Sequence, residues 1–290
     1  MTKKILPSEL PINADGSAFH LHLKPENLSD KILMVGDPDR VSTVADYFDS
    51  RECEVSSREF HTITGTYKGK RITTLSHGIG GDNIEIVMSE LDALANIDFE
   101  ARTVRQTFRQ LSIVRVGTSG GLQPFTPIGT YVAAEKSIGF DGVLWFYDKT
   151  ERVRDISFEQ ALLKQLDWKI PGLIPYVVSA DKSLIEQITK DDILRGTTIA
   201  ANGFYAPQGR ELRLPLADPQ LNAKIEAFDF EGHVITNFEM ESSALAGIAG
   251  LMGHRAMTVC CIIAGRVAKD MNTNYKGSMN GLIETVLDRI

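Results

Sequence analysis

The stretch Lys31-Ile-Leu-Met-Val-Gly-Asp-Pro-Asp-Arg40 contains the pattern that decides the fold. Its apolar run predicts a strand, Gly36 a turn, and the spacing of apolar residues over 41–48 a helix. The same order recurs where the apolar runs 71–76 and 111–116 enter the glycine-containing stretches 77–81 and 117–121. Alternating strands and helices predict an α/β sandwich around a largely buried sheet.

The bulk composition is that of a globular protein. The chain has 290 residues, 43% hydrophobic and 24% charged, and no linker or repeat divides it. We therefore expect one domain over 1–290, with 1–18 as an N-terminal extension. The net charge of −7 argues against bulk binding to nucleic acid or an anionic membrane. Three cysteines, no secretory signal and no apolar stretch of membrane-spanning length favour a soluble, cytoplasmic protein.

Two helices can be predicted from periodicity. One begins at Asp82, which has capping-box spacing to Glu85 and is followed by apolar residues at helical intervals. The other begins near Asn237 and carries an apolar side from Ala244 to Met252. The region 143–196 is more polar and irregular, and the pattern does not place its elements.

Gly36-Asp-Pro-Asp-Arg40 is a candidate phosphate cradle. Asp37 can cap the following helix, Pro38 suits its first position, and Gly36 allows close backbone approach. The N–H groups of the first turn would face the anion, with Arg40 beside them. From the spacing alone, an ordinary capped helix start with a solvated arginine is the favoured interpretation.

Arg115 lies within the apolar run Ser112-Ile-Val-Arg-Val-Gly117, where its guanidinium would lose most of its hydration. A buried charge needs a partner, either a carboxylate or a bound anion. The small residues Gly117, Thr118 and Ser119 follow closely, and on that ground we favour the anion.

Two glycine-rich patterns do not predict nucleotide binding. Gly65-Thr-Tyr-Lys-Gly-Lys70 is one residue too short for a P-loop, and Arg71 replaces the final Ser or Thr. It separates two strand-like runs, which predicts a hairpin turn. The glycine-rich stretches 77–81 and 117–121 do not fit the dinucleotide pattern.

Two further segments carry groups suited to a nucleoside. Asn237-Phe-Glu-Met-Glu-Ser-Ser243 places Glu239 and Glu241 in a first helical turn, where the helix dipole alone would favour acids. The same carboxylates could accept hydrogen bonds from the two vicinal hydroxyls of a ribose. In Gly203-Phe-Tyr-Ala-Pro-Gln-Gly-Arg210, Gln208 and Arg210 offer the donors and the acceptor that a uracil edge needs. Phe204 could stack on the base or belong to the core.

Taken in order, seven segments resemble the uridine phosphorylase branch of the nucleoside phosphorylase family. The match runs from about Phe19 to the C-terminus and is weaker in the middle. The segments are Phe19-His-Leu21, Gly36-Asp-Pro-Asp-Arg-Val41, Ser57-Arg-Glu-Phe60, His77-Gly-Ile-Gly-Gly81, Arg115-Val-Gly-Thr118, Gln208-Gly-Arg210 and Phe238-Glu-Met-Glu-Ser242.

The resemblance implies a role for each matching residue. Phosphate would be bound by Gly36, Arg40, Arg115 and Thr118, with Arg58 from a neighbouring subunit. Ribose would be bound by Met240 and Glu241, with Glu239 nearby and His20 from the neighbour. The base would be bound by Gln208 and Arg210, with apolar walls from Gly120, Phe204, Ile262 and Ile263.

The resemblance also implies the fold, the reaction and the assembly. It predicts a three-layer α/β/α sandwich with a mixed central sheet, and a pentosyltransferase that splits uridine with inorganic phosphate as co-substrate. It predicts a homodimer as the minimal unit, with a hexamer left open, and neither a metal nor an organic cofactor. Some members of the family bind a monovalent cation near the position of Glu59, and the residues here do not decide that point.

The resemblance also bears on the choice of base. Purine-specific bacterial relatives carry an Asp in the loop that here reads Ala264-Gly-Arg-Val267, and the missing carboxylate favours a pyrimidine. We expect Arg266 to anchor the loop that carries Arg210.

Three alternatives stay open. A phosphorylase for a purine or for several bases is the first alternative. A nucleosidase using water is the second, and it would not need Arg40, Arg58 and Arg115 together. A non-catalytic nucleoside-binding protein is the third.

Overall fold

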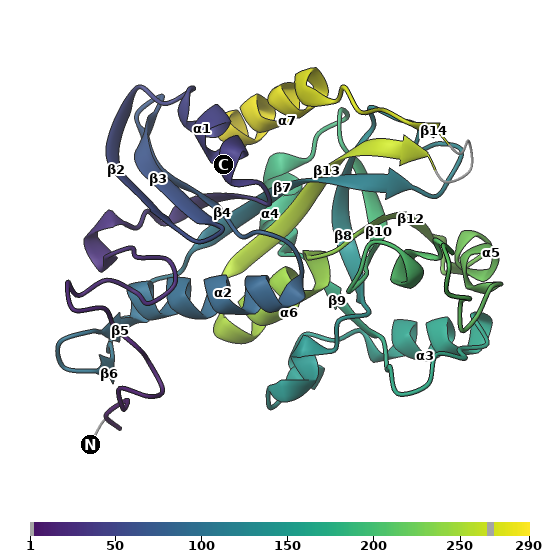
Figure 1. Ribbon diagram of the computed structural model, residues 1–290, viewed down its shortest axis with the longest axis horizontal. Helices are drawn as coiled ribbons and strands as arrows, with labels where there is room; N and C mark the ends of the chain where they lie inside the picture. Colours follow the sequence, from purple (N-terminus) through teal and green to yellow (C-terminus); the bar gives the residue numbers. More distant parts are fainter. Residues whose placement is uncertain (1–2, 266–269) are drawn as a thin grey trace.

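A computed structural model describes residues 3–265 and 270–290 of the chain. A mixed, mostly buried sheet forms its centre, with helices on both faces (Figure 1). The main strands are β1 (Lys31–Val35), β2 (Ser50–Ser57), β3 (Phe60–Tyr67), β4 (Lys70–Ser76), β7 (Ser112–Gly121), β8 (Tyr131–Gly139), β10 (Leu194–Ala200), β12 (His233–Glu239) and β13 (Arg255–Gly265). Shorter strands are β9 (Tyr176–Ser179), β11 (Asp229–Phe230) and β14 (Asp270–Met271), and β5 (Ile97–Asp98) pairs separately with β6 (Thr103–Val104).

The sheet combines an open half and a closed half. In the open half, β1 lies between β4 and β7 and is parallel to both, and the β2–β3–β4 meander forms the edge. In the other half, β7, β13, β8, β10 and β12 follow one another, and β12 pairs back onto β7 at Phe238 and Gly120. The predicted mixed sheet is confirmed. Its partial closure into a ring was not expected, because it depends on pairings between strands far apart in the chain.

The helices form the two outer layers (Figure 1). Helices α1 (Pro38–Ala45), α4 (Lys182–Ile188) and α7 (Lys276–Arg289) pack their apolar sides on one face. Helices α2 (Gly81–Asn96) and α6 (Ser242–Met252) cover the other face, while α3 (Ile156–Gln165) and α5 (Leu221–Glu226) pack near the closed half. The predicted three-layer α/β/α sandwich is therefore confirmed.

Alternation along β7 decides which face receives Arg115. Val114 and Val116 pack in the core beneath α1 and α7, whereas Ile113 packs in the core beneath α2 and α6. Because side chains two apart on a strand share a face, Arg115 points with Ile113 toward α2 and α6. The starts of those two helices supply its surroundings.

Two of the predicted helix starts were wrong. Helix α2 begins at Gly81 after Gly80, and no side chain caps it. Glu85 instead accepts hydrogen bonds from the hydroxyls of Ser89 and Tyr147, so there is no capping box. Helix α6 begins at Ser242, because β12 continues through Asn237 as far as Glu239. Pairing with β10 and β7 keeps those residues extended.

Other local predictions hold. Lys68 and Gly69, both with positive φ, form the tight turn between β3 and β4, so the hairpin is confirmed. The region 143–196 folds into short 3-10 turns followed by α3, β9 and α4. The three cysteines are free thiols, and Cys260 and Cys261 are buried. Within residues 3–265 and 270–290, no helix combines the length and the hydrophobicity that a membrane crossing requires.

Candidate active site

A cavity of about 820 Å³ opens where β1, β7, β12 and β13 end. Its volume lies within the range typical of small-molecule sites, about 300–1,000 Å³. Twelve of the fifteen residues predicted for the site line it, and they come from five separate parts of the chain. They are Gly36, Arg40, Arg115, Thr118, Gly120, Phe204, Gln208, Arg210, Glu239, Met240, Glu241 and Ile263.

Three predicted residues lie elsewhere. Ile262 is fully buried outside the cavity lining, so of the two apolar residues predicted on β13 only Ile263 reaches the cavity. Arg58 is exposed at the β2–β3 turn, with a φ of 56°. His20 is half-buried, with its Nδ1 2.7 Å from an oxygen of Glu90. Their assignment to a neighbouring subunit's site stays a prediction.

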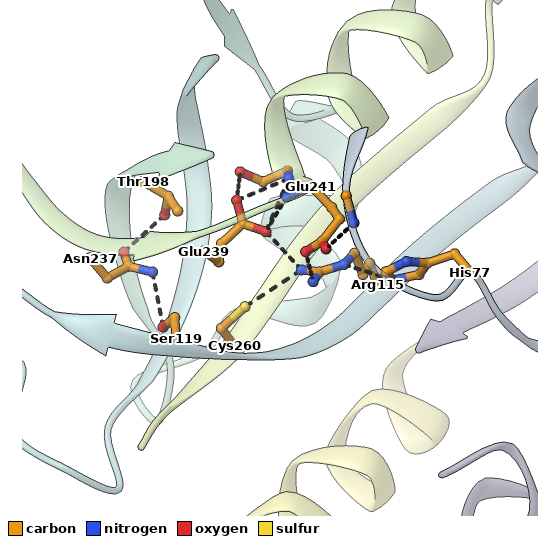
Figure 2. Close-up of polar contacts among 10 residues, drawn as sticks. His77, Arg115, Ser119, Thr198, Asn237, Glu239, Glu241 and Cys260 are labelled. Carbon is orange, nitrogen blue, oxygen red and sulfur yellow. Dashed lines mark hydrogen bonds and ion pairs between the residues drawn. The ribbon is translucent and has the colours of Figure 1, made fainter. Parts of the chain in front are cut away.

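Arg115, which lines the cavity, lies at the centre of a cluster of polar contacts (Figure 2). Its Nη1 donates to Glu239 at 2.9 Å and its Nη2 donates to Glu241, while its Nε donates to His77 at 3.0 Å. The arginine is 4% exposed, so these bonds replace water. The sequence left a carboxylate or an anion as its partner, and we favoured the anion. The structure corrects that preference: two carboxylates of the chain itself account for the burial of the charge.

Gly117 makes room for the guanidinium. A Cβ at this position would lie 2.8 Å from Nη1 and 3.0 Å from Nη2 of Arg115. Real Cβ atoms do not approach a nitrogen so closely, so any side chain would displace the guanidinium. The glycine two residues after the arginine therefore lets the side chain fold back over its own strand.

The two carboxylates are held independently of Arg115. Glu239 accepts hydrogen bonds from the backbone N–H groups of Glu241 and Ser242, at 2.9 and 3.0 Å, and from the Ser242 hydroxyl. It therefore caps α6 from the last position of β12, rather than from the first helical turn that we predicted. Glu241 is the N-cap residue of α6, and its other oxygen accepts from the Gly80 N–H at 2.8 Å.

The electrostatics of this cluster leave an excess of negative charge. Burial alone lowers the pKa of Arg115, but Glu241 and Glu239 outweigh it and raise that pKa, so the guanidinium stays charged. Burial raises the pKa of Glu241 and the nearby Glu239 raises it further, against the pull of Arg115. One cation thus serves two acids. An anion from solution that binds beside these two acids needs further positive charge, and Arg40, which also lines the cavity, supplies it.

The loop after β1 differs in one respect from the predicted cradle. Asp37 caps α1 through its side chain, and Pro38 is the first helical residue, as expected. However, the Asp39 N–H donates to that side chain and the Arg40 N–H to the Asp37 carbonyl. The first-turn amides are therefore already bonded, and the charge for an anion must come from side chains. Gly36 still brings its backbone to the cavity; a Cβ there would lie 3.3 Å from the Gly78 carbonyl oxygen.

The outer end of the cavity is a loop around a short 3-10 turn, Ala206–Gln208. Arg210 donates to the side-chain oxygen of Gln208 at 2.7 Å and to the carbonyl of Phe204. Its guanidinium lies 3.9 Å from the centre of the Phe204 ring, in a cation–π contact. Phe204 is 46% exposed, so it is not a core residue, which was one of the two interpretations of the sequence.

We call these two parts the sheet end and the loop end of the cavity. The sheet end comprises Gly36, Arg115, Glu239 and Glu241, and the loop end comprises Phe204, Gln208 and Arg210. Glu59, near which a cation was considered, also lines the cavity, and the cation stays a prediction. The expected anchoring of the loop by Arg266 lies outside the described residues.

Some lining residues had no role in the sequence interpretation. Ser119 faces the cavity, and its hydroxyl bonds to the Asn237 amide, which bonds in turn to Thr198 (Figure 2). Tyr275 also lines the cavity. Asn237 lies in the segment with the two acids and Ser119 follows Arg115, so proximity to those motifs was the available signal. Tyr275 had no comparable signal in the sequence.

Comparisons with known proteins extend this picture. Residues 30–284 match the family model described as the phosphorylase superfamily. A uridine phosphorylase of Thermococcus kodakarensis is 28% identical over 93% of this chain and 85% of its own length. A uridine phosphorylase of Haemophilus influenzae is 26% identical over 87% of this chain and 88% of its own length.

Solved structures agree on the fold. A nucleoside phosphorylase of Trypanosoma brucei, described as showing uridine phosphorylase activity, superimposes with a TM-score of 0.87 at 28% identity. That comparison covers 97% of this chain and 98% of the other. A purine nucleoside phosphorylase of Toxoplasma gondii in complex with immucillin-H gives a TM-score of 0.64 at 19% identity. The superposition covers 93% of this chain and 94% of the other. The latter likeness concerns the fold alone.

Proposed function

Because the chain belongs to the phosphorylase superfamily, we propose that it is a uridine phosphorylase, which converts uridine and inorganic phosphate to uracil and ribose 1-phosphate. The observation that carries this function is the buried Arg115, held in one cavity with two carboxylates and with the Gln208–Arg210 pair. The relatives named uridine phosphorylase, matched over most of the chain, support the same substrate.

Phosphate occupies the sheet end beside Arg115, Thr118 and the backbone of Gly36. The Arg115, Glu239 and Glu241 cluster has a net negative charge by itself. A phosphate dianion therefore needs Arg40, and we propose that Arg58 of a second subunit adds the remaining positive charge. Both arginines position the nucleophile electrostatically, which requires no proton transfer. The active unit is then a homodimer or a larger assembly built from it.

Ribose lies between phosphate and base. Glu241 is oriented by the Gly80 N–H, so its oxygens are preorganised acceptors for vicinal hydroxyls. Glu239 lies nearby, with its oxygens already bonded to Arg115 and to the start of α6. Met240 covers the sugar from the same segment. We propose that the partner's copy of His20 meets the 5′-hydroxyl.

The base lies at the loop end. As the glycosidic bond breaks, negative charge develops on the departing uracil, and Arg210 and Gln208 are placed to stabilise it through hydrogen bonds. Arg210 already contacts Phe204 and Gln208, so base binding exchanges part of these contacts for contacts with uracil. The described part of the strand end, Ala264-Gly265, carries no carboxylate that could protonate a purine.

The three earlier alternatives are possible outcomes of the test. Uridine cleavage is followed by absorbance with and without inorganic phosphate. We expect uracil release only with phosphate, together with ribose 1-phosphate. Cleavage without phosphate would identify a nucleosidase, and cleavage of inosine or adenosine but not of uridine would identify a purine phosphorylase. Binding of uridine without any turnover would identify a nucleoside-binding protein.

We further propose that the enzyme acts in pyrimidine salvage in the cytoplasm.

A further inference from the structure

His77 follows β4 directly and lies beside the guanidinium of Arg115 (Figure 2). The residue is completely buried, and its Nε2 is 3.0 Å from Arg115 Nε. On its other side the ring faces the loop after β1, since a Cβ on Gly36 would lie 3.7 Å from His77 Cε1. His77 thus lies between Arg115 and the Gly36 backbone, two groups assigned to phosphate.

The chemistry of this contact determines where the histidine carries its proton. An arginine Nε always carries a hydrogen, so His77 Nε2 must accept. The proton of the neutral ring is therefore on Nδ1. Burial lowers the pKa of His77, and the charges of Arg115 and Arg40 lower it further, which keeps the ring neutral. A neutral acceptor holds Arg115 in place without neutralising its positive charge.

A second buried histidine, His254 just before β13, shows a different pattern. His254 accepts from the Leu111 N–H through Nδ1, and its Nε2 lies 3.1 Å from Asp92. Both of its nitrogens are bonded to groups of the scaffold, as expected of a structural histidine. In His77, by contrast, Nδ1 has no hydrogen-bond partner within residues 3–265 and 270–290. The Gly78 backbone is near enough to raise the pKa of the ring against the effects of burial and of the two arginines, but in that part of the chain the His77 ring bond with hydrogen-bond geometry is the one to Arg115.

The rest of the cluster does not depend on this contact. Glu239 is held by the Glu241 and Ser242 N–H groups, and Glu241 by the Gly80 N–H. If the bond from His77 were lost, the two carboxylates would keep their backbone anchors. The guanidinium, however, would lose the bond at its Nε and could rotate about its bonds to the carboxylates. Such a rotation misplaces the arginine for phosphate while leaving the ribose acceptors in position.

We propose that His77 is a positioning residue for Arg115, and that it sets the affinity of the enzyme for phosphate rather than for the nucleoside. The proposal rests on the proposed function, because it assigns phosphate to Arg115. It adds to the site a residue from the His77-Gly-Ile-Gly-Gly81 segment that the binding roles above do not use.

The test compares His77→Gln, His77→Asn and His77→Leu. A glutamine places its oxygen about where Nε2 lies, an asparagine carries its oxygen too close to the backbone, and a leucine has no acceptor. We expect KM for phosphate, and Kd for phosphate by calorimetry, to rise about tenfold in the Asn and Leu variants. KM for uridine should change less than about threefold, and the Gln variant should recover most of the phosphate affinity.

The control is His254→Gln, which removes a buried histidine that precedes β13 and does not line the cavity. We expect it to lower the melting temperature without a selective change in KM for phosphate. An equal rise of both KM values in the three His77 variants, or unchanged phosphate affinity in His77→Leu, would overturn the positioning role. Failure of the Gln variant to differ from the Asn variant would also overturn it.

A measurement on the wild-type protein separates this proposal from the proposed function. Nitrogen-15 NMR of labelled histidine reports the tautomer of His77 regardless of any activity. The proton is expected on Nδ1, and a proton on Nε2 would show that the contact with Arg115 is absent. A wild-type enzyme that neither requires nor binds phosphate would refute the function and with it the phosphate role of His77. Phosphate dependence with the wrong tautomer would refute only the inference made here.

Discussion

The two ends of the cavity are constructed by different means. At the sheet end, Arg115, Glu239 and Glu241 are each 5% exposed or less, and their bonds run to strand ends, helix starts and one another. At the loop end, Phe204 is 46% exposed while Gln208 is buried, and the bonds from Arg210 to Phe204 and Gln208 lie within the loop that carries all three. The sheet end is thus part of the core, whereas the loop end belongs to a partly exposed loop that lines the cavity.

This difference has a consequence for energetics. A buried ion pair that loses one partner leaves an uncompensated charge in a low dielectric, so chemistry and stability are coupled at the sheet end. Substitutions at the loop end break no buried ion pair, so they should cost less stability, about 1 kcal/mol. We therefore expect variants of the sheet end to lose activity and stability together. Variants of the loop end should change substrate preference in a protein of nearly normal stability.

Arg115→Ala should have the largest effect. It leaves Glu239 and Glu241 buried without their cation, which should cost about 3–5 kcal/mol in the free energy of unfolding. The lost contact with phosphate should lower kcat/KM for phosphate by about tenfold to a hundredfold. Urea denaturation and initial-rate kinetics measure the two effects. Near-normal activity in a folded variant would remove Arg115 from the phosphate site.

Arg115→Lys is the matched control for that substitution. It keeps the positive charge but lacks the planar set of donors that reaches two carboxylates and His77 together. We expect it to recover more stability than activity. If it recovered both equally, charge alone would account for the role of Arg115.

Gly117→Ala should act on the same guanidinium without touching its charge. The added methyl carbon would lie 2.8 Å from Nη1, and so it should push the side chain away from the carboxylates. We expect kcat/KM to fall about tenfold, together with a loss of stability smaller than that of Arg115→Ala. Unchanged kinetics would mean that the guanidinium can move without consequence for catalysis.

Gln208→Ala tests the loop end. It removes the acceptor for Arg210 and one of the two groups assigned to the uracil edge. We expect KM for uridine to rise about tenfold, and the ratio of activity on uridine to activity on thymidine to change. Because Gln208 is 4% exposed and its amide also donates to the Gly203 carbonyl, the free energy of unfolding should fall by about 1 kcal/mol, less than in Arg115→Ala. An unchanged substrate ratio would contradict the role of Gln208, and a large loss of stability would contradict the contrast between the two ends.

Asp37→Ala should have the smallest effect on catalysis. The Asp37 side chain caps α1, and its loss should cost about 1 kcal/mol of stability. Because the first-turn amides are bonded within the turn, we expect KM for phosphate to rise by less than about threefold. A tenfold rise would show that the start of α1 contributes directly to binding the anion. Asp37→Ser, which retains a cap, serves as the control.

Local sequence patterns predicted much of the fold, for reasons that the structure makes visible. The apolar runs beginning at Lys31 and Ser112 became buried parallel strands, since strands covered on both faces need apolar side chains throughout. The Lys68-Gly69 turn and the Asp37-Pro38 helix start depend on residues adjacent in the chain. The segments that carried the family resemblance also supplied most of the residues that line the cavity.

What went wrong in the prediction depended on long-range contacts. The segment from Asn237 to Glu239 was expected to enter a helix, but pairing with β7 and β10 keeps it extended. Ile262 and Ile263 looked equivalent, yet only Ile263 reaches the cavity. The roles of His20 and Arg58 need a second subunit, about which a single chain gives no geometry.

The sequence by itself determined the strand–helix alternation, the turns and the set of polar groups suited to phosphate, ribose and a pyrimidine. These follow from periodicity, from the backbone preferences of glycine and proline, and from the chemistry of side chains. Only the tertiary structure decided that Arg115 is neutralised by Glu239 and Glu241 and held by His77. A partner for a buried charge is chosen by the folding of distant segments onto one face of the sheet, and no local pattern records which segments those are.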